Sequence, residues 1–273
     1  MTSAAVIQMT SSADPHENLQ TAYQLLQQAA RRGAQLAVLP ENFTLMGMSE
    51  QDNFAIAEHD NDGPVQTWLA NTARQLGLWI VAGTMPLKIP GESRVAAACL
   101  VVNAQGERVA RYDKIHLYDV DVDDATGSYR ESNTIAPGHR PVLIDTPVGR
   151  LGLAICYDVR FPELFRQLSA LDQEAGAEVL VLPAAFTVPT GRAHWDVLLR
   201  ARAIENLCYL LAAGQTGLHA NGRETYGHSM IVDSWGEVLA TLGTEVGVQV
   251  ATIDLGKQRE QRRKFPVLAH RRL

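Results

Sequence analysis

Two segments of the chain share one residue pattern, and this pattern constrains the fold. Gly33–Phe43 reads GAQLAVLPENF, and Gly176–Phe186 reads GAEVLVLPAAF. Each contains a short apolar run, typical of a buried strand, that stops at a proline. A helical pattern precedes each run, and patterns of a helix, a strand and a hairpin follow it. Two buried strands can look alike because both are apolar, but the matched Gly, Ala, Pro and Phe favour a structural repeat. We therefore predict an α/β fold in which two similar sheets pack together with helices outside.

Composition excludes several classes of protein. The 273 residues suit one large domain or two small ones. A net charge of −6 leaves no electrostatic footprint for nucleic acid as the main partner, and no apolar run approaches the ~20 residues that span a bilayer. The stretch 4–9 follows no basic region, so we interpret it as the first strand and not as a secretory signal. Three cysteines without CxxC spacing predict a reduced, cytoplasmic protein with no zinc cluster.

Apolar periodicity and turn residues predict the other elements. One helix is predicted to begin at Asp14–Pro15 and to end at Gly33, and a second to begin at Gly63–Pro64 and to end at Gly77. Two further helices are predicted over roughly 162–172 and 192–206. Strands are predicted over 35–39, 78–82, 179–182 (stopping at Pro183), 208–213 and 247–253, and hairpins over 94–103 with 107–114 and 225–234 with 237–241. The stretch 116–138 lacks periodicity and is predicted to be a long functional loop. The basic tail, 257–273, can be a nucleic-acid arm, but its interleaved apolar residues favour a packed or dimer-contacting segment.

Cys156 lies where a predicted strand turns into a predicted helix. The segment Leu151–Glu163 reads LGLAICYDVRFPE. Its first half is apolar, while Pro162 suits the first turn of a helix and Glu163 suits the positive end of the helix dipole. A thiol at such a junction can project into a cleft, where free backbone N–H groups favour its reactive thiolate form. A lone cysteine in an apolar strand is also commonly a small buried hydrophobe, and this segment alone leaves both interpretations open.

Three charged residues stand out elsewhere. Glu41 directly follows a buried strand, where it can be a general base toward a thiol or an ordinary capping acid. Lys114 ends a strand, where it can donate to a developing oxyanion or remain a solvated lysine at a sheet edge. Glu131 lies within the 116–138 loop and by itself resembles a surface acid.

Taken together, these motifs resemble one family. The motifs PENF at Glu41, YDKIHL at Lys114, RES at Glu131 followed by APG, and ICYDVRFPEL at Cys156 occur in the order and approximate spacing of the nitrilase superfamily of carbon–nitrogen hydrolases. The resemblance runs from the first strand to GHSMIVDS at 227–234 and so covers nearly the whole chain. It implies one domain over 1–273 with two pseudo-repeated halves, folded as a four-layer α-β-β-α sandwich.

The resemblance also implies roles for individual residues. Cys156 is expected to be the nucleophile, Glu41 the general base, Lys114 the catalytic lysine and Glu131 a second glutamate that holds the lysine in position. The backbone N–H of Tyr157 is expected to join Lys114 in stabilising the oxyanion, and Tyr157 is also expected beside the substrate. No metal or organic cofactor is implied. Members of the family commonly form homodimers or larger homo-oligomers, so a homodimer is expected.

The motifs also resemble particular branches of the family. Cys156-Tyr157-Asp158 differs from the Cys-Trp-Glu usual in nitrilases, and residues 262–272 resemble the branch that hydrolyses deaminated glutathione to 2-oxoglutarate and Cys-Gly. The alternatives are an ω-amidase acting on 2-oxoglutaramate or 2-oxosuccinamate, and an N-carbamoyl amino acid hydrolase. All these reactions use a small-molecule substrate that bears an anionic group.

Three further residues and two segments are expected near that substrate. Arg160 is the candidate for binding a carboxylate, unless it pairs with a nearby acid such as Glu163. Phe186 and Thr187 are expected to border the pocket because they repeat the position of Glu41. Residues 45–52 and 123–128 depart from the family pattern and are expected at the substrate entrance.

Overall fold

A computed structural model describes residues 1–169 and 176–272 of the chain. Its first six-stranded sheet is ordered β16 (Gly247–Ile253), β1 (Thr2–Gln8), β2 (Leu36–Val38), β3 (Trp79–Lys88), β4 (Val95–Val102) and β5 (Arg108–Asp113). The three strands β1, β2 and β3 are parallel. At one edge β16 is antiparallel to β1, and at the other β4 and β5 continue as antiparallel strands.

The second sheet repeats these strand directions. Its order is β15 (Val238–Thr241), β14 (Met230–Val232), β11 (Tyr209–Gly214), β10 (Val179–Ala184), β9 (Gly149–Leu153) and β8 (Leu143–Thr146). The strands β9, β10 and β11 are parallel, while β8 and the pair β14–β15 are antiparallel to their neighbours. The central parallel strands, β2 and β10, come from the two similar segments 33–43 and 176–186.

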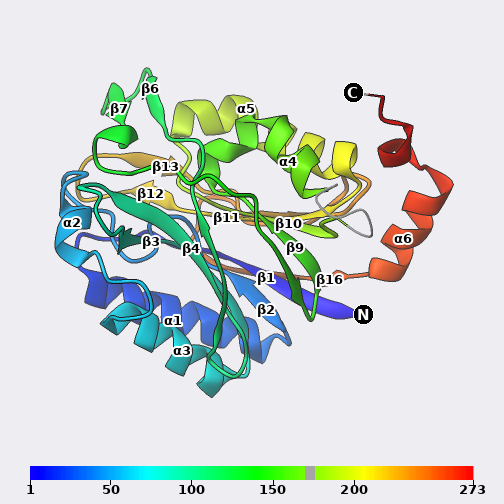
Figure 1. Ribbon diagram of the computed structural model, residues 1–273, viewed down its shortest axis with the longest axis horizontal. Helices are drawn as coiled ribbons and strands as arrows, with labels where there is room; N and C mark the ends of the chain where they lie inside the picture. Colours follow the sequence, from blue (N-terminus) through cyan, green and yellow to red (C-terminus); the bar gives the residue numbers. More distant parts are fainter. Residues whose placement is uncertain (170–175, 273) are drawn as a thin grey trace.

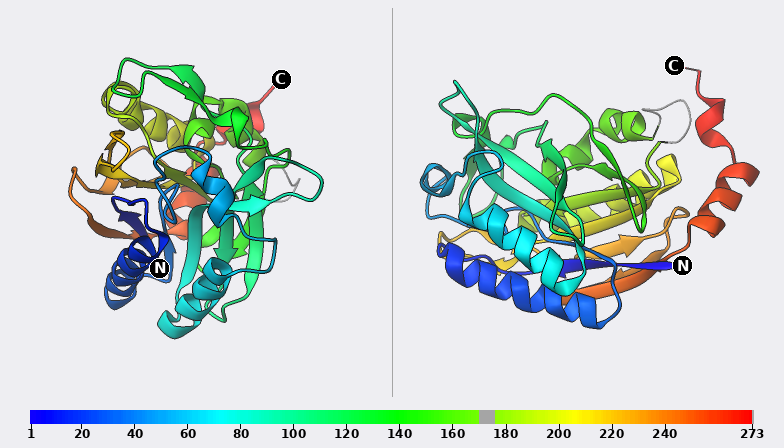
Figure 2. Two further views of the ribbon diagram at one scale, coloured as in Figure 1. Left: turned by 90° about the vertical axis from the view of Figure 1, so that its left-hand side faces the viewer. Right: turned by 60° about the horizontal axis from the view of Figure 1, so that its bottom comes forward.

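Helices cover the outer face of each sheet (Figure 1; Figure 2). α1 (Pro15–Arg31) and α3 (Pro64–Leu76) lie on the first sheet, and α4 (Pro162–Leu168) and α5 (Val188–Asn206) lie on the second. The Asp14 side chain accepts a hydrogen bond from His16 N and so caps α1, and Gly77 ends α3 in the left-handed region at φ 60°. The chain is therefore a four-layer α-β-β-α sandwich, which confirms the predicted fold class.

Alternating side chains of the central strands build two cores. Ala4 and Val6 of β1 pack in the core that includes the second sheet, whereas Ala5 and Ile7 pack in the core shared with α1 and α3. This division follows the two-residue period of a strand. Both faces of the parallel strands are thus apolar, which explains why these strands appear in the sequence as continuous apolar runs.

The predicted loop 116–138 is partly regular, so the prediction that it lacks regular structure was wrong. β6 (Asp119–Asp121) and β7 (Ser128–Arg130) form a two-stranded hairpin, and a 3₁₀ turn follows at Glu131–Asn133. The Asp124 carboxylate accepts the N–H groups of Thr126 and Gly127 and so holds the turn. Strands of three residues are too short to show apolar periodicity.

Other predicted boundaries also differ from the structure. β10 runs through Pro183 to Ala184; beyond Val181 it pairs only with β11, so the N–H that proline lacks is not required on the β9 side. α5 begins at Val188, not at 192, with a proline in its first turn. α4 ends at Leu168, and 170–172 of its predicted range lie outside the described residues.

Several short elements were not predicted as separate units. They are β8, α2 (Asp52–Ile56), and the pair β12 (Thr216–Leu218) and β13 (Glu224–Tyr226). The predicted hairpin over 225–241 is therefore only partly correct. β14 and β15 do pair across Trp235-Gly236, but Thr225 belongs to β13.

The basic tail packs against the body of the protein. α6 (Leu255–Lys264) is followed by a 3₁₀ turn at Val267–His270. Gln258 is buried and donates to the carbonyls of Glu178 and Leu207, and Arg259 forms an ion pair with Glu178. The packed alternative for this tail is therefore the correct one. Every helix within residues 1–169 and 176–272 is too short or too polar to cross a membrane.

Candidate active site

A pocket opens at the end of the sandwich opposite α6, where α2, β6–β7 and β12–β13 gather (Figure 1). Its walls come from residues that directly follow strands of both sheets, because parallel strands end at the same edge. Glu41 follows β2, Lys114 follows β5, and Phe186 and Thr187 follow β10. The pocket encloses about 790 Å³ when the open solvent at its mouth is included.

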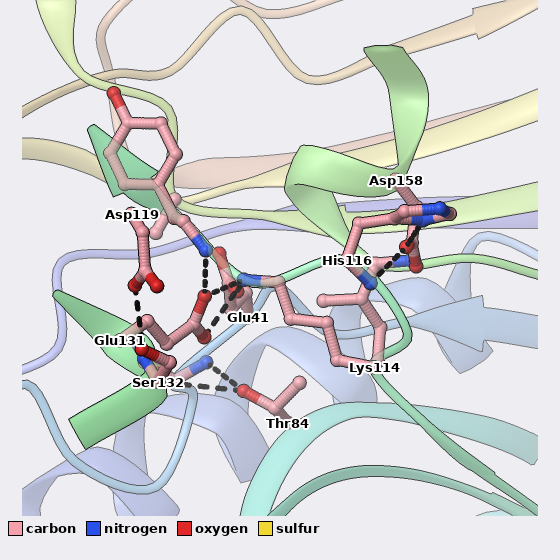
Figure 3. Close-up of polar contacts among 12 residues, drawn as sticks. Glu41, Thr84, Lys114, His116, Asp119, Glu131, Ser132 and Asp158 are labelled. Carbon is pink, nitrogen blue, oxygen red and sulfur yellow. Dashed lines mark hydrogen bonds and ion pairs between the residues drawn. The ribbon is translucent and has the colours of Figure 1, made fainter. Parts of the chain in front are cut away.

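A buried lysine joins two carboxylates inside this pocket (Figure 3). Lys114 Nζ lies 2.8 Å from Glu41 Oε1 and 2.9 Å from both carboxylate oxygens of Glu131. Glu131 also accepts the backbone N–H of Tyr118 at 2.6 Å. Lys114 and Glu41 are almost fully buried, so their charges interact with little screening by water. The structure therefore brings these three predicted residues together.

The backbone around Glu41 is fixed from both sheets. A Cβ on Gly83 of β3 would lie 2.1 Å from the Pro40 carbonyl oxygen, so only glycine permits this close approach. Gln215, which follows β11, donates to the Glu41 carbonyl at 3.0 Å. Thr84 Oγ1 accepts the backbone N–H of Asn42 at 2.8 Å. These contacts hold the Glu41 carboxylate against Lys114.

Cys156 occupies a strained turn at the pocket wall. It begins a 3₁₀ helix, Cys156–Arg160, and its φ of +45° lies in the left-handed region that non-glycine residues rarely adopt. Such strain, at about 1–3 kcal/mol, persists only where the surroundings enforce it and is common at active sites. The Glu41 carboxylate and the backbone N–H of Ala185 lie close enough to the thiol to shift its pKa.

The charges of this cluster shift one another's titration. Burial and the negative charge of Glu41 raise the pKa of Cys156, while the Lys114 ammonium lowers it. Burial raises the pKa of Glu41, but the Lys114 ammonium and hydrogen bonds from Lys114 and Cys156 outweigh it, so this pKa is lowered. Burial, together with the charge of Glu41, raises the pKa of Glu131 despite Lys114. Burial thus favours the neutral thiol, and a carboxylate that can accept its proton lies beside it.

Asp158 connects the turn of Cys156 to the segment of Lys114. This buried carboxylate accepts Ile155 N at 2.8 Å and Tyr112 Oη at 2.7 Å on one oxygen, and His116 N at 3.0 Å and His116 Nδ1 at 2.7 Å on the other (Figure 3). Tyr112 and His116 flank Lys114 at alternate positions along the chain. One carboxylate therefore joins the turn that carries the thiol to the segment that carries the ammonium.

We expect Asp158→Asn to destabilise the protein by about 2–4 kcal/mol. An amide has one oxygen and one NH₂ group, so the NH₂ group must face two of these donors and leave them buried without an acceptor. Urea unfolding measures the change. The control is Asp145→Asn, which removes a largely exposed carboxylate and should cost less than about 1 kcal/mol. Equal stability of the two variants would contradict this role for Asp158.

The predicted substrate-facing residues all line the pocket. Arg160 lies 5.7 Å from the ring centre of Tyr157 and 5.4 Å from that of Phe186, and its Nη1 contacts His194 Nδ1 at 3.3 Å. No carboxylate of the described residues, Glu163 included, lies within ion-pair distance of Arg160. Thr187 is buried beside Phe186. An unpaired guanidinium among aromatic rings suits binding of a carboxylate.

The pocket entrance differs from expectation. Glu50, from the segment 45–52, lines it, but none of residues 123–128 does; Tyr129 lines it instead. Residues 123–127 lie in the turn of the β6–β7 hairpin, where Asp124 accepts the N–H groups of Thr126 and Gly127 and the hydroxyl of Tyr129.

Sequence reasoning missed other residues of the site. Arg223 lines the pocket but follows an ordinary turn, Asn221-Gly222, whose sequence carries no sign of it. Asp158 was visible only as part of the motif Cys156-Tyr157-Asp158, and its contacts with Tyr112 and His116 come from the fold. The described residues contain no group of three or more His, Cys, Asp or Glu placed to hold a metal ion.

Comparison with known proteins agrees with this geometry. Residues 3–263 match the family described as carbon-nitrogen hydrolase. The chain belongs to the carbon-nitrogen hydrolase family. It is therefore an amidohydrolase that acts on carbon–nitrogen bonds other than peptide bonds, which confirms the family and the enzyme class predicted from its motifs.

Individual members of the family are closely similar to this chain. The deaminated glutathione amidase of Yersinia enterocolitica is 44% identical over 98% of this chain and 92% of its own length. The crystal structure of the Caenorhabditis elegans NitFhit protein has a TM-score of 0.89 and 38% identity; it covers 99% of this carbon-nitrogen hydrolase, which spans only 65% of that longer chain. An amidase from Nesterenkonia sp. AN1, with a TM-score of 0.77 and 26% identity over 97% of this chain and 98% of its own, was solved with acrylamide added to its active-site cysteine.

Proposed function

We propose that this carbon-nitrogen hydrolase cleaves deaminated glutathione into 2-oxoglutarate and cysteinylglycine. The observation that carries the proposal is the buried array of Glu41, Lys114 and Glu131 facing Cys156 in a pocket that also holds an unpaired arginine. The 44% identity to a deaminated glutathione amidase over nearly the whole chain supports this substrate. The acrylamide adduct of the Nesterenkonia amidase supports a cysteine nucleophile.

In the first half of the reaction, Cys156 attacks the amide carbonyl carbon. Glu41 takes the thiol proton as the C–S bond forms, and the carbonyl electron pair moves onto oxygen. Lys114 and the N–H of Tyr157 stabilise this oxyanion. When the oxyanion collapses, Glu41 returns the proton to the amide nitrogen, the C–N bond breaks and cysteinylglycine leaves. A thioester of Cys156 remains.

The second half uses the same groups on water. Glu41 removes a proton from water, the oxygen attacks the thioester carbonyl, and Lys114 again faces the oxyanion. Collapse breaks the C–S bond, the proton returns to sulfur, and 2-oxoglutarate is released. Glu131 keeps Lys114 charged and in place through both halves, because its two oxygens hold the ammonium at 2.9 Å.

Arg160 is proposed to bind the carboxylate of the 2-oxoacyl group. It lies four residues after the nucleophile, and the rings of Tyr157 and Phe186 hold its guanidinium. Thr187 and Phe186 form the neighbouring wall. A cation fixed before the substrate binds loses little freedom on binding, which favours affinity.

The test measures release of 2-oxoglutarate from deaminated glutathione and from 2-oxoglutaramate, because both substrates yield this product. We expect the higher kcat/KM for deaminated glutathione, and no release by Cys156→Ala. Cys208→Ala is the matched control, since Cys208 is also buried but lies outside the pocket; it should keep full activity. A preference for 2-oxoglutaramate would make the protein an ω-amidase, and no release from either substrate would refute the proposal.

We also propose that residues 1–273 form a single domain with two pseudo-repeated halves, located in the cytoplasm. A core that combines Val6 and Val38 of the first sheet with Leu151 and Val181 of the second supports one folding unit. Three free cysteines support a reducing compartment.

A homodimer is proposed as the assembly. Exposed apolar side chains on α5, the β14–β15 turn and the tail support it: Val197, Ile204, Trp235 and Phe265, of which Trp235 and Phe265 are in contact. Sedimentation velocity of the intact chain tests this assembly, and a single monomer peak at micromolar concentration would refute it.

A further inference from the structure

A second arginine in the pocket is not used by the steps above. Arg223 lies between β12 and β13 and lines the pocket together with Cys156. Its Nη2 donates to the Ala185 carbonyl, and its guanidinium lies 5.2 Å from the ring centre of Tyr129. Its Nε is buried and has no hydrogen-bond partner. The side chain is thus held in place with part of its donor capacity unused.

Arg223 also lacks a carboxylate partner. Among the described residues, no Asp or Glu oxygen lies within 4.0 Å of its guanidinium. Arg111, in contrast, forms ion pairs with Asp60 and Asp113, and Arg202 forms one with Glu205. Glu50 is the acid at the pocket mouth whose titration Arg223 affects, yet it stays beyond ion-pair distance. A half-buried guanidinium with a free donor is costly unless an anion completes it.

The two arginines face different parts of the pocket. Arg160 rests on Tyr157 and Phe186, whereas Arg223 rests on Tyr129. The ring of Tyr118 lies between these two positions, with its centre 5.1 Å from that of Tyr129 and 5.1 Å from that of Tyr157. Because Arg160 is taken by the carboxylate of the acyl group, Arg223 is the arginine of the pocket that remains for the leaving group.

We propose that Arg223 binds a carboxylate on the leaving group and so selects amides that carry a carboxylate on both sides of the cleaved bond. This inference rests on the proposed function and deepens it. Arg160 holds the carboxylate of the acyl group, and Arg223 holds the terminal carboxylate of a peptide-like amine such as cysteinylglycine. A substrate that releases ammonia engages only Arg160.

Two substrates separate this role from a general one. Arg223→Gln should lower kcat/KM for deaminated glutathione by about 10- to 100-fold, the usual cost of a lost charge-assisted hydrogen bond. The loss of kcat/KM for 2-oxoglutaramate should be much smaller, because that leaving group has no carboxylate. Turnover of 2-oxoglutaramate also reports that the variant is folded. Arg160→Gln, in contrast, should impair both substrates.

A change in the substrate provides the matched test. In this analogue the terminal carboxylate of deaminated glutathione is converted to a carboxamide. The kcat/KM of the wild type for the analogue should be about as low as the kcat/KM of Arg223→Gln for the unmodified substrate. In Arg223→Gln the conversion should have little further effect, since the two changes remove the same interaction. Arg223→Lys should recover part of the loss, because it keeps the charge.

Three results would overturn the assignment. One is an equal loss for both substrates in Arg223→Gln, and another is a wild type indifferent to the carboxamide conversion; either leaves the proposed function standing. The third is the same substrate-specific loss in Glu50→Gln, which would mean that Arg223 serves to hold Glu50. No release of 2-oxoglutarate from either substrate by the wild type would instead refute the proposed function, and this assignment with it.

Discussion

Replacing Lys114 with methionine should remove most of the activity and much of the stability. The ammonium is proposed to face the oxyanion in both halves of the reaction, so kcat/KM should fall by at least about 10²–10³. The same change leaves the carboxylates of Glu41 and Glu131 in the interior without the cation that lies 2.8–2.9 Å from them. Removing one partner of a buried ion pair costs about 3–5 kcal/mol. Urea unfolding and steady-state kinetics measure the two effects.

The loss of stability in Lys114→Met should grow with pH. Burial and the charge of Glu41 already raise the pKa of Glu131, and without Lys114 only the hydrogen bond from the backbone N–H of Tyr118 opposes this rise. A carboxyl whose pKa is raised in the folded state binds more protons there than in the unfolded chain, so stability falls as pH rises above the unfolded value of about 4.3. The difference in unfolding free energy from the wild type should therefore be larger at pH 8 than at pH 5.

A double variant separates charge from volume. Lys114→Met with Glu131→Gln removes one of the two carboxylates, so it should regain stability at pH 8 while remaining inactive. If Lys114→Met were as stable as the wild type, or equally destabilised at both pH values, the buried array would not hold the charges described above.

The fold was predictable because its signals are repeated and strong. The segments 33–43 and 176–186 became β2 and β10, the central parallel strands of two sheets with the same strand directions. Apolar side chains on both faces of these strands require cover on both sides, which a four-layer sandwich supplies. The failures were short elements: strands of three residues, such as β6 and β7, carry too few positions for a period.

The predicted site residues lie at the ends of strands, and for this reason they could be recognised in the sequence. An acid after an apolar strand, as at Glu41, or a lysine ending one, as at Lys114, is unusual enough to stand out in sequence. Parallel strands then bring such ends to one edge of the sandwich, where the structure places both beside Cys156. The catalytic roles of these residues remain predictions that the variants described here test.

Residues that act through long-range contacts were not predictable. Arg223 is separated by more than sixty residues from Cys156 and belongs to a polar hairpin whose sequence fits any surface turn. Only the pairing of β12 with β13, and the contact with the Ala185 carbonyl, bring it into the pocket. The same holds for Gln215, whose bond to the Glu41 carbonyl joins the two sheets.

Glu41→Gln should lower turnover by about 10²–10⁴, the range expected when a general base is lost. Glutamine keeps the volume and an oxygen for Lys114 but cannot take the proton of Cys156. Because burial raises the pKa of that thiol, few thiolates form unaided near neutral pH. Both halves of the reaction need the base, so the thioester should also hydrolyse slowly once formed.

The pH dependence of alkylation distinguishes a lost base from a disturbed pocket. In the wild type, the rate at which iodoacetamide alkylates Cys156 should vary little between about pH 6 and about pH 9. The reason is that Glu41 accepts the thiol proton during the attack. In Glu41→Gln the rate should rise roughly tenfold for each pH unit, because only the thiolate reacts. Glu131→Gln is the matched control: it lowers turnover through the position of Lys114 but leaves Glu41 beside the thiol, so its alkylation profile should stay flat. A flat profile in Glu41→Gln would show that another group takes the proton, and Glu41 would then only position Lys114.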